Sequence, residues 1–285
     1  MTNALIASRD RFAAANPEER VVVAGREWGV VDTGGAGPAL LLIPGTLGRG
    51  DIFWQQIEAL RGRARMLAVT YPATGGIAEW ADDLAALMTD RGIDRAVVVV
   101  SSLGGYLAQY MAAVHAGRVE RLVAANTLCS VALVRQVPPY SSDLDNGPIG
   151  ELRDGFGKGL RAWAASHPEQ ADLVALLLAE VGGRIPEPEL RTRLNGIKRA
   201  PELPAVGIPT ERIVTVEAAD DPLIPPFMRD EVRARLNPSV ACRFESGGHF
   251  PYVARPALYT ALLEEQLGLV PTGSTAWGEG EVRAR

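Results

Sequence analysis

The chain has 285 residues, of which 47% are hydrophobic, which is enough for a large buried core and too many for an intrinsically disordered chain. Its net charge is −5 and it has no basic stripe, which argues against a nucleic-acid-binding protein. Its apolar runs are much shorter than the roughly 20 residues of a membrane span, so we expect no stable membrane insertion.

The N-terminal segment and the cysteines indicate a cellular compartment. The first residues, MTNALIASRDRFAAANPEER, are broken by charges and contain no apolar core of a signal peptide. Cys129 and Cys242 are far apart and lack the spacing of metal ligands. We therefore expect a reduced, cytoplasmic protein, with a single structural disulfide as the minor alternative.

Strand patterns begin with a hairpin and then recur along the chain. Residues 19–24 and 27–32 are predicted to form two short strands joined by a turn that contains glycine. Apolar runs typical of strands buried on both faces follow. The further strand candidates cover residues 38–43, 66–70, 96–100, 121–125, 212–216 and 240–245.

Helical patterns alternate with these strands. Apolar residues three or four positions apart follow most strand candidates, as expected for helices with one buried face. They are Phe53, Ile57 and Leu60; Trp80, Leu84 and Leu87; Leu107, Met111 and Val114; and Met228, Val232 and Leu236. This alternation predicts an α/β fold, with a mostly parallel sheet of about eight strands flanked by helices and the hairpin at one edge.

One long segment interrupts the alternation. Between residues 130 and 208 there is no clear strand, only helical segments at about 151–166, 169–180 and 187–198. We expect a single domain with a core at about 19–129 and 209–269 and an inserted helical lid at about 130–208. The tail, 270–285, is rich in glycine and charge without periodicity, and it is predicted to be disordered.

The segment AVVVVSSLGGY, residues 96–106, has the pattern of a nucleophile elbow: a buried strand, a serine, two glycines and a helix start. Ser102 fits the nucleophile because Gly104 lies two residues after it, whereas Ser101 would have Leu103 there. Val100 stands where G-x-S-x-G requires its first glycine, so a neighbouring strand or helix would have to shift. The alternative is that Ser102 is a helix N-cap.

A serine hydroxyl needs an adjacent base, and the chain has three histidines. His249, in ESGGHFPY, follows the last strand candidate on a glycine-rich loop, at the strand end where ligands collect in open α/β sheets. His115 is placed about 10 Å or more along the helix that begins at the elbow. His167 lies in the lid and is expected to face solvent. The alternative for His249 is a histidine that caps a turn.

The acid is expected between the serine and the histidine, which is the chain order of hydrolases built on such an elbow. The strand candidate at 212–216 is followed by an acidic turn, and Asp221, before Pro222, is our assignment. Asp220 remains the alternative. The acid would fix the imidazole tautomer and stabilise the imidazolium. The turn after residues 121–125 offers Asn126 and Thr127, and neither is a carboxylate.

Acyl transfer also needs hydrogen-bond donors for the negative charge that develops on the carbonyl oxygen. The backbone N–H of Leu103, next to the nucleophile, is one candidate. Thr46, in the loop IPGTLGRG at residues 43–50, is the second candidate by position. The alternative interpretation of this loop is a plain glycine turn.

Together these residues resemble the α/β-hydrolase superfamily over about residues 19–269. Three stretches are similar to its maspardin-like branch: DIFWQQIEAL at 51–60, SLGGYLAQ at 102–109 and GGHFPY at 247–252. The loop Ile43-Pro-Gly45 has proline where many family members have histidine before glycine. The resemblance implies the fold and catalysis but no particular substrate, and the branch includes proteins with an incomplete triad.

The expected function is that of a serine esterase: hydrolysis of a carboxylic ester or related acyl compound, without metal or organic cofactor. Leucines of the lid, Leu173 to Leu178, are compatible with an apolar acyl group, or they form the lid's own core. Fold does not fix chemistry, so C–C hydrolysis, acyl transfer, perhydrolysis and lyase reactions stay open. The alternative from another class is a non-catalytic binding protein. A homodimer is compatible with the sequence.

Overall fold

The computed structural model describes residues 3–273, 277, 280 and 282–284. In these residues one nine-stranded sheet has the order β1-β2-β4-β3-β5-β6-β7-β8-β9. The strands are β1 (Glu19–Val23), β2 (Arg26–Asp32), β3 (Ala39–Ile43), β4 (Arg65–Thr70), β5 (Ala96–Ser101), β6 (Val119–Ala125), β7 (Ile213–Ala218), β8 (Val240–Phe244) and β9 (Val282–Ala284). The β1–β2 and β2–β4 pairs are antiparallel and the others are parallel, as predicted.

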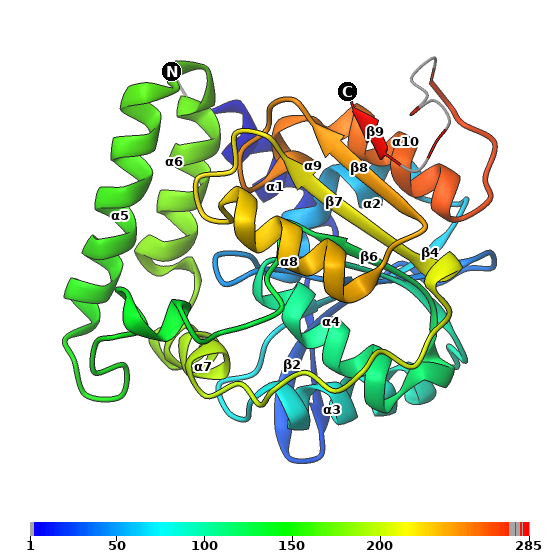
Figure 1. Ribbon diagram of the computed structural model, residues 1–285, viewed down its shortest axis with the longest axis horizontal. Helices are drawn as coiled ribbons and strands as arrows, with labels where there is room; N and C mark the ends of the chain where they lie inside the picture. Colours follow the sequence, from blue (N-terminus) through cyan, green and yellow to red (C-terminus); the bar gives the residue numbers. More distant parts are fainter. Residues whose placement is uncertain (1–2, 274–276, 278–279, 281, 285) are drawn as a thin grey trace.

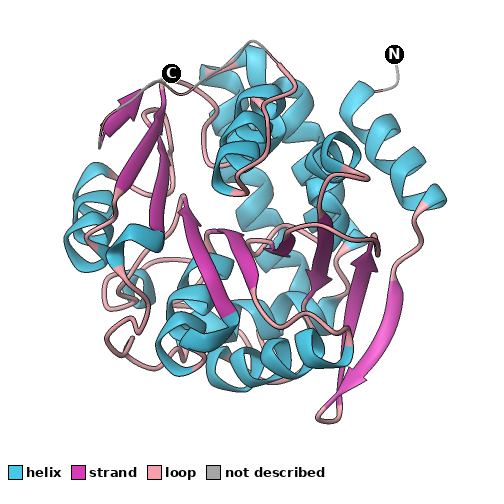
Figure 2. Cartoon of the chain, turned by 90° about the vertical axis from the view of Figure 1, so that its right-hand side faces the viewer, coloured by secondary structure: helices cyan, strands magenta, loops and turns pink. Residues whose placement is uncertain are grey.

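Helices cover both faces of the sheet (Figures 1 and 2). Their bounds are α1 (Ala4–Ala15), α2 (Trp54–Leu60), α3 (Ile77–Asp90), α4 (Leu103–Val114), α5 (Ile149–Ser166), α6 (Ala171–Ala179), α7 (Glu187–Lys198), α8 (Pro226–Leu236), α9 (Pro251–Ala254) and α10 (Pro256–Gln266). None of the described helices is both long and apolar enough to cross a membrane.

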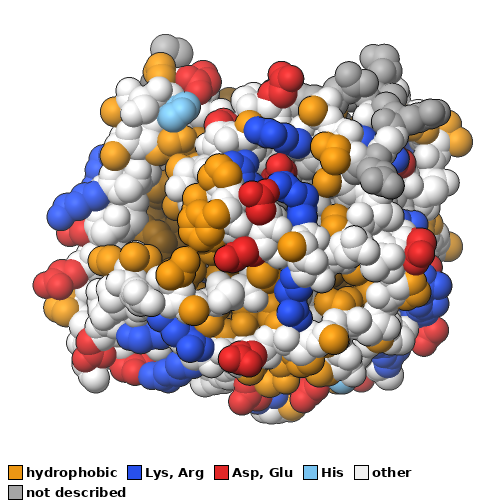
Figure 3. All heavy atoms as spheres, viewed as in Figure 1, with side chains coloured by type: hydrophobic (Ala, Val, Ile, Leu, Met, Phe, Trp, Pro, Cys, Tyr) orange, Lys and Arg blue, Asp and Glu red, His pale blue; other side chains and the backbone are white. Residues whose placement is uncertain are grey.

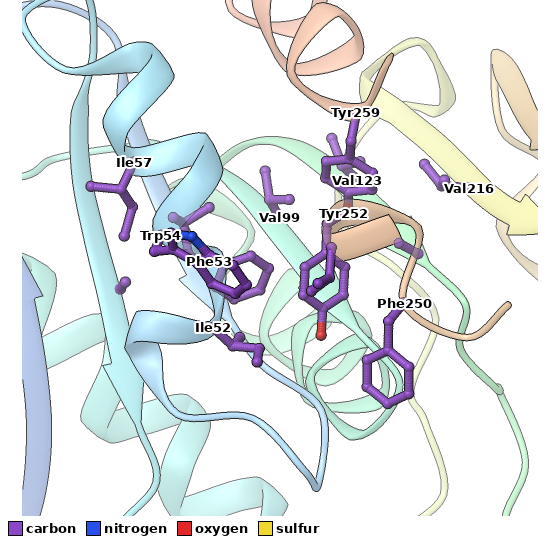
Figure 4. Close-up of a cluster of buried hydrophobic side chains, with 14 of the residues drawn as sticks. Ile52, Phe53, Trp54, Ile57, Val99, Val123, Val216, Phe250, Tyr252 and Tyr259 are labelled. Carbon is purple, nitrogen blue, oxygen red and sulfur yellow. The ribbon is translucent and has the colours of Figure 1, made fainter. Parts of the chain in front are cut away.

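Strand residues alternate between two cores because successive side chains point to opposite faces of a sheet. Leu40 and Leu42 of β3 pack with α1, α2, α9 and α10, whereas Leu41 and Ile43 pack with α3, α4 and α8. Figure 4 shows part of the first core, in which aromatic side chains from α2, α9 and α10 lie against the valines of the central strands. This two-sided covering explains why the central strands are continuous apolar runs.

The helices α5, α6 and α7 lie between β6 and β7 in the chain and form one side of the molecule (Figure 1). Helix α1, which the sequence did not predict, packs against α6. Five of its twelve residues are alanines, and its larger apolar residues are Leu5, Ile6 and Phe12. Phe12 is buried, and the buried Arg9 forms an ion pair with Glu180. Helix α1 therefore combines local signals, its alanines and an Asn3 side chain that caps the Ile6 N–H, with tertiary contacts.

Part of the C-terminal tail, which was predicted to be disordered, lies within the described residues and contacts the rest of the protein. Trp277 is buried, its indole nitrogen donates to the carbonyl of Leu258 at 3.1 Å, and its ring lies edge-on to Phe244 at 4.9 Å. Strand β9 extends the sheet by pairing with β8. One buried aromatic side chain and strand pairing at the sheet edge thus connect Trp277 and residues 282–284 to the rest of the protein. Residues 274–276, 278–279, 281 and 285 of the tail lie outside the described residues.

Candidate functional site

Ser102 lies at a sharp turn between β5 and α4. Its φ is +53° and its ψ is −117°, a conformation that non-glycine residues rarely adopt and that concentrates at functional sites. Ser102 occupies the N-cap position of α4, but its side chain makes no cap hydrogen bond to the helix. The Thr127 hydroxyl donates to the Ser102 carbonyl at 2.7 Å and holds the strained turn from β6.

Two glycines allow α4 to approach the neighbouring backbone closely. A Cβ on Gly104 would lie 2.5 Å from the carbonyl oxygen of Ile43, and a Cβ on Gly105 would lie 2.2 Å from the hydroxyl of Thr127. Both distances are far below van der Waals contact. Gly104 therefore lets the amino end of α4 lie directly against the end of β3, and Gly105 leaves room for the Thr127 side chain.

The valine in place of the first elbow glycine is accommodated without the expected shift. Val100 is fully buried and pairs in regular register with Ile43 on one side and Ala124 on the other. The register shift of β5 lies at Ala96 and Val97, at the opposite end of the strand. The Val100 side chain belongs to the same apolar core as α3 and α4, so the site retains a regular strand up to the turn.

The structure brings Asp221 and His249 together. The Asp221 carboxylate oxygens lie 2.9 Å and 3.1 Å from Nδ1 of His249, and both residues are buried. The amide nitrogen of Asn126 donates to Asp221 Oδ2 at 2.8 Å, and the backbone N–H of Leu223 donates to Oδ1 at 2.8 Å. Every contact of this carboxylate keeps it in one orientation facing the imidazole.

Asp220 contacts the backbone of the histidine loop and not the histidine side chain. Its carboxylate accepts the backbone N–H groups of Gly247 at 3.1 Å and Gly248 at 2.9 Å. It therefore supports the loop that carries His249 but does not contact the imidazole ring. The geometry favours Asp221 over Asp220 as the partner of the histidine.

The electrostatics of Asp221 suit a group that stays ionised. Burial alone would raise its pKa, but the pKa is lowered because the attraction of His249 and hydrogen bonds from His249, Asn126 and Leu223 outweigh desolvation. A carboxylate held in its charged form stabilises a positive charge on the adjacent imidazole.

The two backbone donors predicted for a developing oxyanion both lie beside Ser102. Thr46 and Ser102 line the same cavity, and a Cβ on Gly45 would lie only 3.7 Å from Ser102 Oγ. Leu103 begins α4, where backbone N–H groups have no partner within the helix. Within the described residues, neither the Thr46 nor the Leu103 amide donates to another backbone carbonyl outside the regular elements.

Ser102 and His249 open into one cavity of about 760 Å³. Figure 3 shows a hollow lined by apolar side chains on the face that carries the lid helices. The apolar lining residues are Leu47, Pro138, Pro139, Tyr140, Pro148, Leu152, Phe156, Leu160, Trp163, Pro222, Leu223 and Phe250. Among the lid helices, the wall comes from α5 rather than from α6.

The charged residues of the lining are of one sign. Asp143 and Glu151, both exposed, belong to it, and no lysine or arginine does among the described lining residues. The leucine-rich stretch at 173–178 does not line the cavity. Leu173, Leu176 and Leu177 are buried in the core that the inserted helices share with α1 and one face of the sheet.

The other polar candidates lie apart from this cavity. Nε2 of His115 lies 2.7 Å from a carboxylate oxygen of Asp82 at the surface. The ring of His167 packs against that of Trp163, with 5.8 Å between the ring centres. Cys129 and Cys242 are free thiols. Over the described ranges, no group of three or more His, Cys, Asp or Glu residues could hold a metal ion.

Sequence reasoning passed over Asn126 and Thr127 because they offer no carboxylate. In the structure Asn126 holds Asp221 and Thr127 holds the Ser102 turn. A signal was present, since both residues directly follow β6, the neighbour of the strand that carries Ser102. Asn126 also has a φ of +44°, which asparagine adopts more readily than most residues.

Comparisons with known proteins agree with this architecture. A model of the family described as "Alpha/beta hydrolase family" matches residues 40–262. The chain is 24% identical to maspardin of Danio rerio over 260 residues, which cover 86% of this chain and 81% of that protein. It is 29% identical to the lipase LipV of Mycobacterium tuberculosis over 198 residues, which cover 65% of this chain and 73% of that protein. The predicted resemblance to maspardin is confirmed.

Solved structures show the same fold. The enol-lactonase of Burkholderia xenovorans LB400 superposes with a TM-score of 0.72 and 19% identity, covering 88% of this chain and 100% of that chain. A thermophilic esterase from Thermogutta terrifontis gives a TM-score of 0.71 at 20% identity, covering 88% and 98%. With the family match over most of its length, the chain belongs to the alpha/beta hydrolase family.

Proposed function

We propose that this protein is a serine hydrolase that cleaves a carboxylic ester or a related acyl compound through an acyl-enzyme. The observation that carries the proposal is the buried Asp221–His249 pair, 2.9 Å apart, whose histidine lines the same cavity as Ser102 on its strained turn. A nucleophile, a base and a group that orients the base are the parts that acyl transfer requires.

In the proposed mechanism, Ser102 Oγ attacks the carbonyl carbon of the substrate while His249 Nε2 accepts the serine proton. The tetrahedral oxyanion accepts hydrogen bonds from the Thr46 and Leu103 amides. The carbon–oxygen bond to the leaving alcohol then breaks, and His249 returns the proton to that alcohol. Water, deprotonated by His249, attacks the carbonyl carbon of the acyl-enzyme, the bond to Ser102 Oγ breaks, and His249 returns the proton to Ser102 as the acid is released. Asp221 accepts the Nδ1–H bond throughout and balances the imidazolium charge.

The test of this proposal is covalent labelling by a fluorophosphonate probe, which reacts with activated serines. We expect labelling of the wild type and none of Ser102→Ala. Ser101→Ala is the matched control, because Ser101 is the adjacent serine but is fully buried and does not line the cavity. Correctly folded wild type that resists labelling, or Ser102→Ala that still reacts, would contradict the proposal and favour a non-catalytic binding protein.

The cavity also predicts the kind of acyl group. Its walls are mostly apolar and its ionised groups are carboxylates, so a substrate carboxylate would lose hydration without gaining a cation. We expect kcat/KM for p-nitrophenyl hexanoate to exceed that for the mono-p-nitrophenyl ester of adipic acid by about tenfold or more, equivalent to about 1.4 kcal/mol. Initial rates with the two six-carbon acyl groups measure this ratio, and equal rates would contradict it.

A further inference from the structure

A fully buried arginine of the lid lies behind the loop that carries Thr46. Arg193, on α7, is 0% exposed, and burial lowers its pKa to about 10, so it is charged at neutral pH. Its Nη2 atom lies 3.1 Å from a carboxylate oxygen of Glu189, one turn earlier on the same helix. Burying a guanidinium is costly, so its other contacts indicate what the charge does.

Those contacts are with the oxyanion loop, which we define as residues 44–50. The Nη1 atom of Arg193 donates to the carbonyl of Thr46 at 3.1 Å and to the carbonyl of Gly48 at 2.7 Å. The N–H of Gly48 donates to the carbonyl of Gly45 at 3.1 Å and closes the turn that contains Thr46. One guanidinium nitrogen therefore bridges two carbonyls on this turn.

Tyr71 holds the same loop from the sheet. Its fully buried hydroxyl donates to the carbonyl of Pro44 at 2.9 Å. The guanidinium carbon of Arg193 lies 5.3 Å from the centre of the Tyr71 ring, within the range of a cation–π contact. The stacked pair thus engages three carbonyls of the loop, those of Pro44, Thr46 and Gly48.

The loop needs such support because its glycines give its backbone high conformational freedom. It contains three glycines, at positions 45, 48 and 50, and a glycine-rich segment has more conformational freedom than others. An oxyanion donor is effective only if it is fixed before charge develops on the substrate, so a loose Thr46 amide would lose most of its effect.

We infer that Arg193 and Tyr71 are positioning residues that fix the oxyanion loop and thereby couple the lid helix α7 to the rate of acyl transfer. This inference rests on the proposed function. It adds a consequence for the lid: α7 cannot move away from the sheet without releasing the carbonyls of Thr46 and Gly48. Displacement of α7 from the sheet would therefore weaken the oxyanion hole.

The test compares Arg193→Lys, Arg193→Gln and Tyr71→Phe with the wild type. We expect kcat for p-nitrophenyl hexanoate to fall by about 10²-fold in Arg193→Gln and by somewhat less in Arg193→Lys. In Tyr71→Phe it should fall by about tenfold or less. KM should stay within about twofold of the wild-type value in all three variants. Affinity for a trifluoromethyl ketone, which forms a tetrahedral oxyanion with the serine, should fall in parallel with kcat. A purely structural role would lower the active fraction and leave that affinity unchanged.

Arg135→Gln is the control, because Arg135 also bridges two carbonyls, those of Lys198 and Ala200, but at the far end of α7 and away from the cavity. Its kcat should match the wild type. If Arg193→Gln does not fold, Tyr71→Phe, which loses only one hydroxyl, still tests the inference. Wild type without fluorophosphonate labelling would refute the proposed function. Labelled wild type with unchanged kcat and ketone affinity in Arg193→Lys and Tyr71→Phe would refute this inference alone.

Discussion

Replacing Asp221 with asparagine is expected to lower kcat by about 10⁴-fold with little change in fold, the magnitude seen when the acid of a serine–histidine pair becomes an amide. The neighbours of Asp221 make this loss severe. Both carboxylate oxygens lie near Nδ1 of His249, and each also accepts another hydrogen bond, Oδ2 from Asn126 and Oδ1 from the N–H of Leu223. An asparagine NH₂ group would therefore meet a donor at either position, and it would favour the imidazole tautomer that has no proton on Nδ1. Ester hydrolysis rates on the purified variant measure the effect.

Asp220→Asn is the matched control, because it makes the same chemical change one residue earlier. Asp220 accepts two backbone N–H groups of the histidine loop, and an asparagine oxygen can still accept one of them. We expect a loss of activity of about 10²-fold or less, since one hydrogen bond to a charged group is worth about 1.5–3 kcal/mol. A larger loss in Asp220→Asn than in Asp221→Asn would mean that the assigned acid is wrong.

These two aspartates also mark the limit of what the sequence can predict. Both follow β7 and precede a proline-rich turn, so residue type and position predict an acid there but do not distinguish the two side chains. The distinction depends on which carboxylate the backbone of Leu223 and the amide of Asn126 hold toward His249. The Asn126 contact joins segments 95 residues apart, and no local pattern reports it.

The strands and the elbow were predictable for a physical reason. A strand buried on both faces must be a continuous apolar run, and a nucleophile on a tight turn must be followed by small residues, so both leave a local pattern. The cavity wall left a weaker pattern in α5, where Leu152, Phe156, Leu160 and Trp163 recur at helical spacing. The stretch at 173–178 is more apolar and therefore gives the stronger pattern, but it packs into the core and does not line the cavity.

Arg193 could not be predicted as a buried residue. Its spacing from Glu189 is that of an ordinary surface ion pair on a helix, and such pairs contribute little when exposed. Only the packing of α7 against the oxyanion loop buries this pair. The residues that hold the site in shape were therefore harder to find than the residues proposed to carry the reaction, because support depends on contacts between distant segments.

Gly104→Ala is expected to lower the free energy of unfolding by about 3 kcal/mol, the upper part of the range for an overpacked core, and to slow fluorophosphonate labelling strongly. The added Cβ would lie 2.5 Å from the carbonyl oxygen of Ile43 and 2.8 Å from that of Pro44. Both are backbone atoms at the start of the oxyanion loop, so a side-chain rotation cannot relieve the clash. Either α4 or the loop must move. Urea denaturation and labelling rates measure the two effects.

The control for this prediction is Gly117→Ala, because a Cβ at Gly117 meets no atom within 4 Å and this glycine has no positive φ. Its stability should stay within about 0.5 kcal/mol of the wild type, as for most surface substitutions. Wild-type stability and labelling in Gly104→Ala would contradict the close approach of α4 to β3. Lost labelling with wild-type stability would instead mean that the oxyanion loop moves to relieve the clash. Such a shift would cost little folding free energy, but it would move the Thr46 amide away from the developing charge.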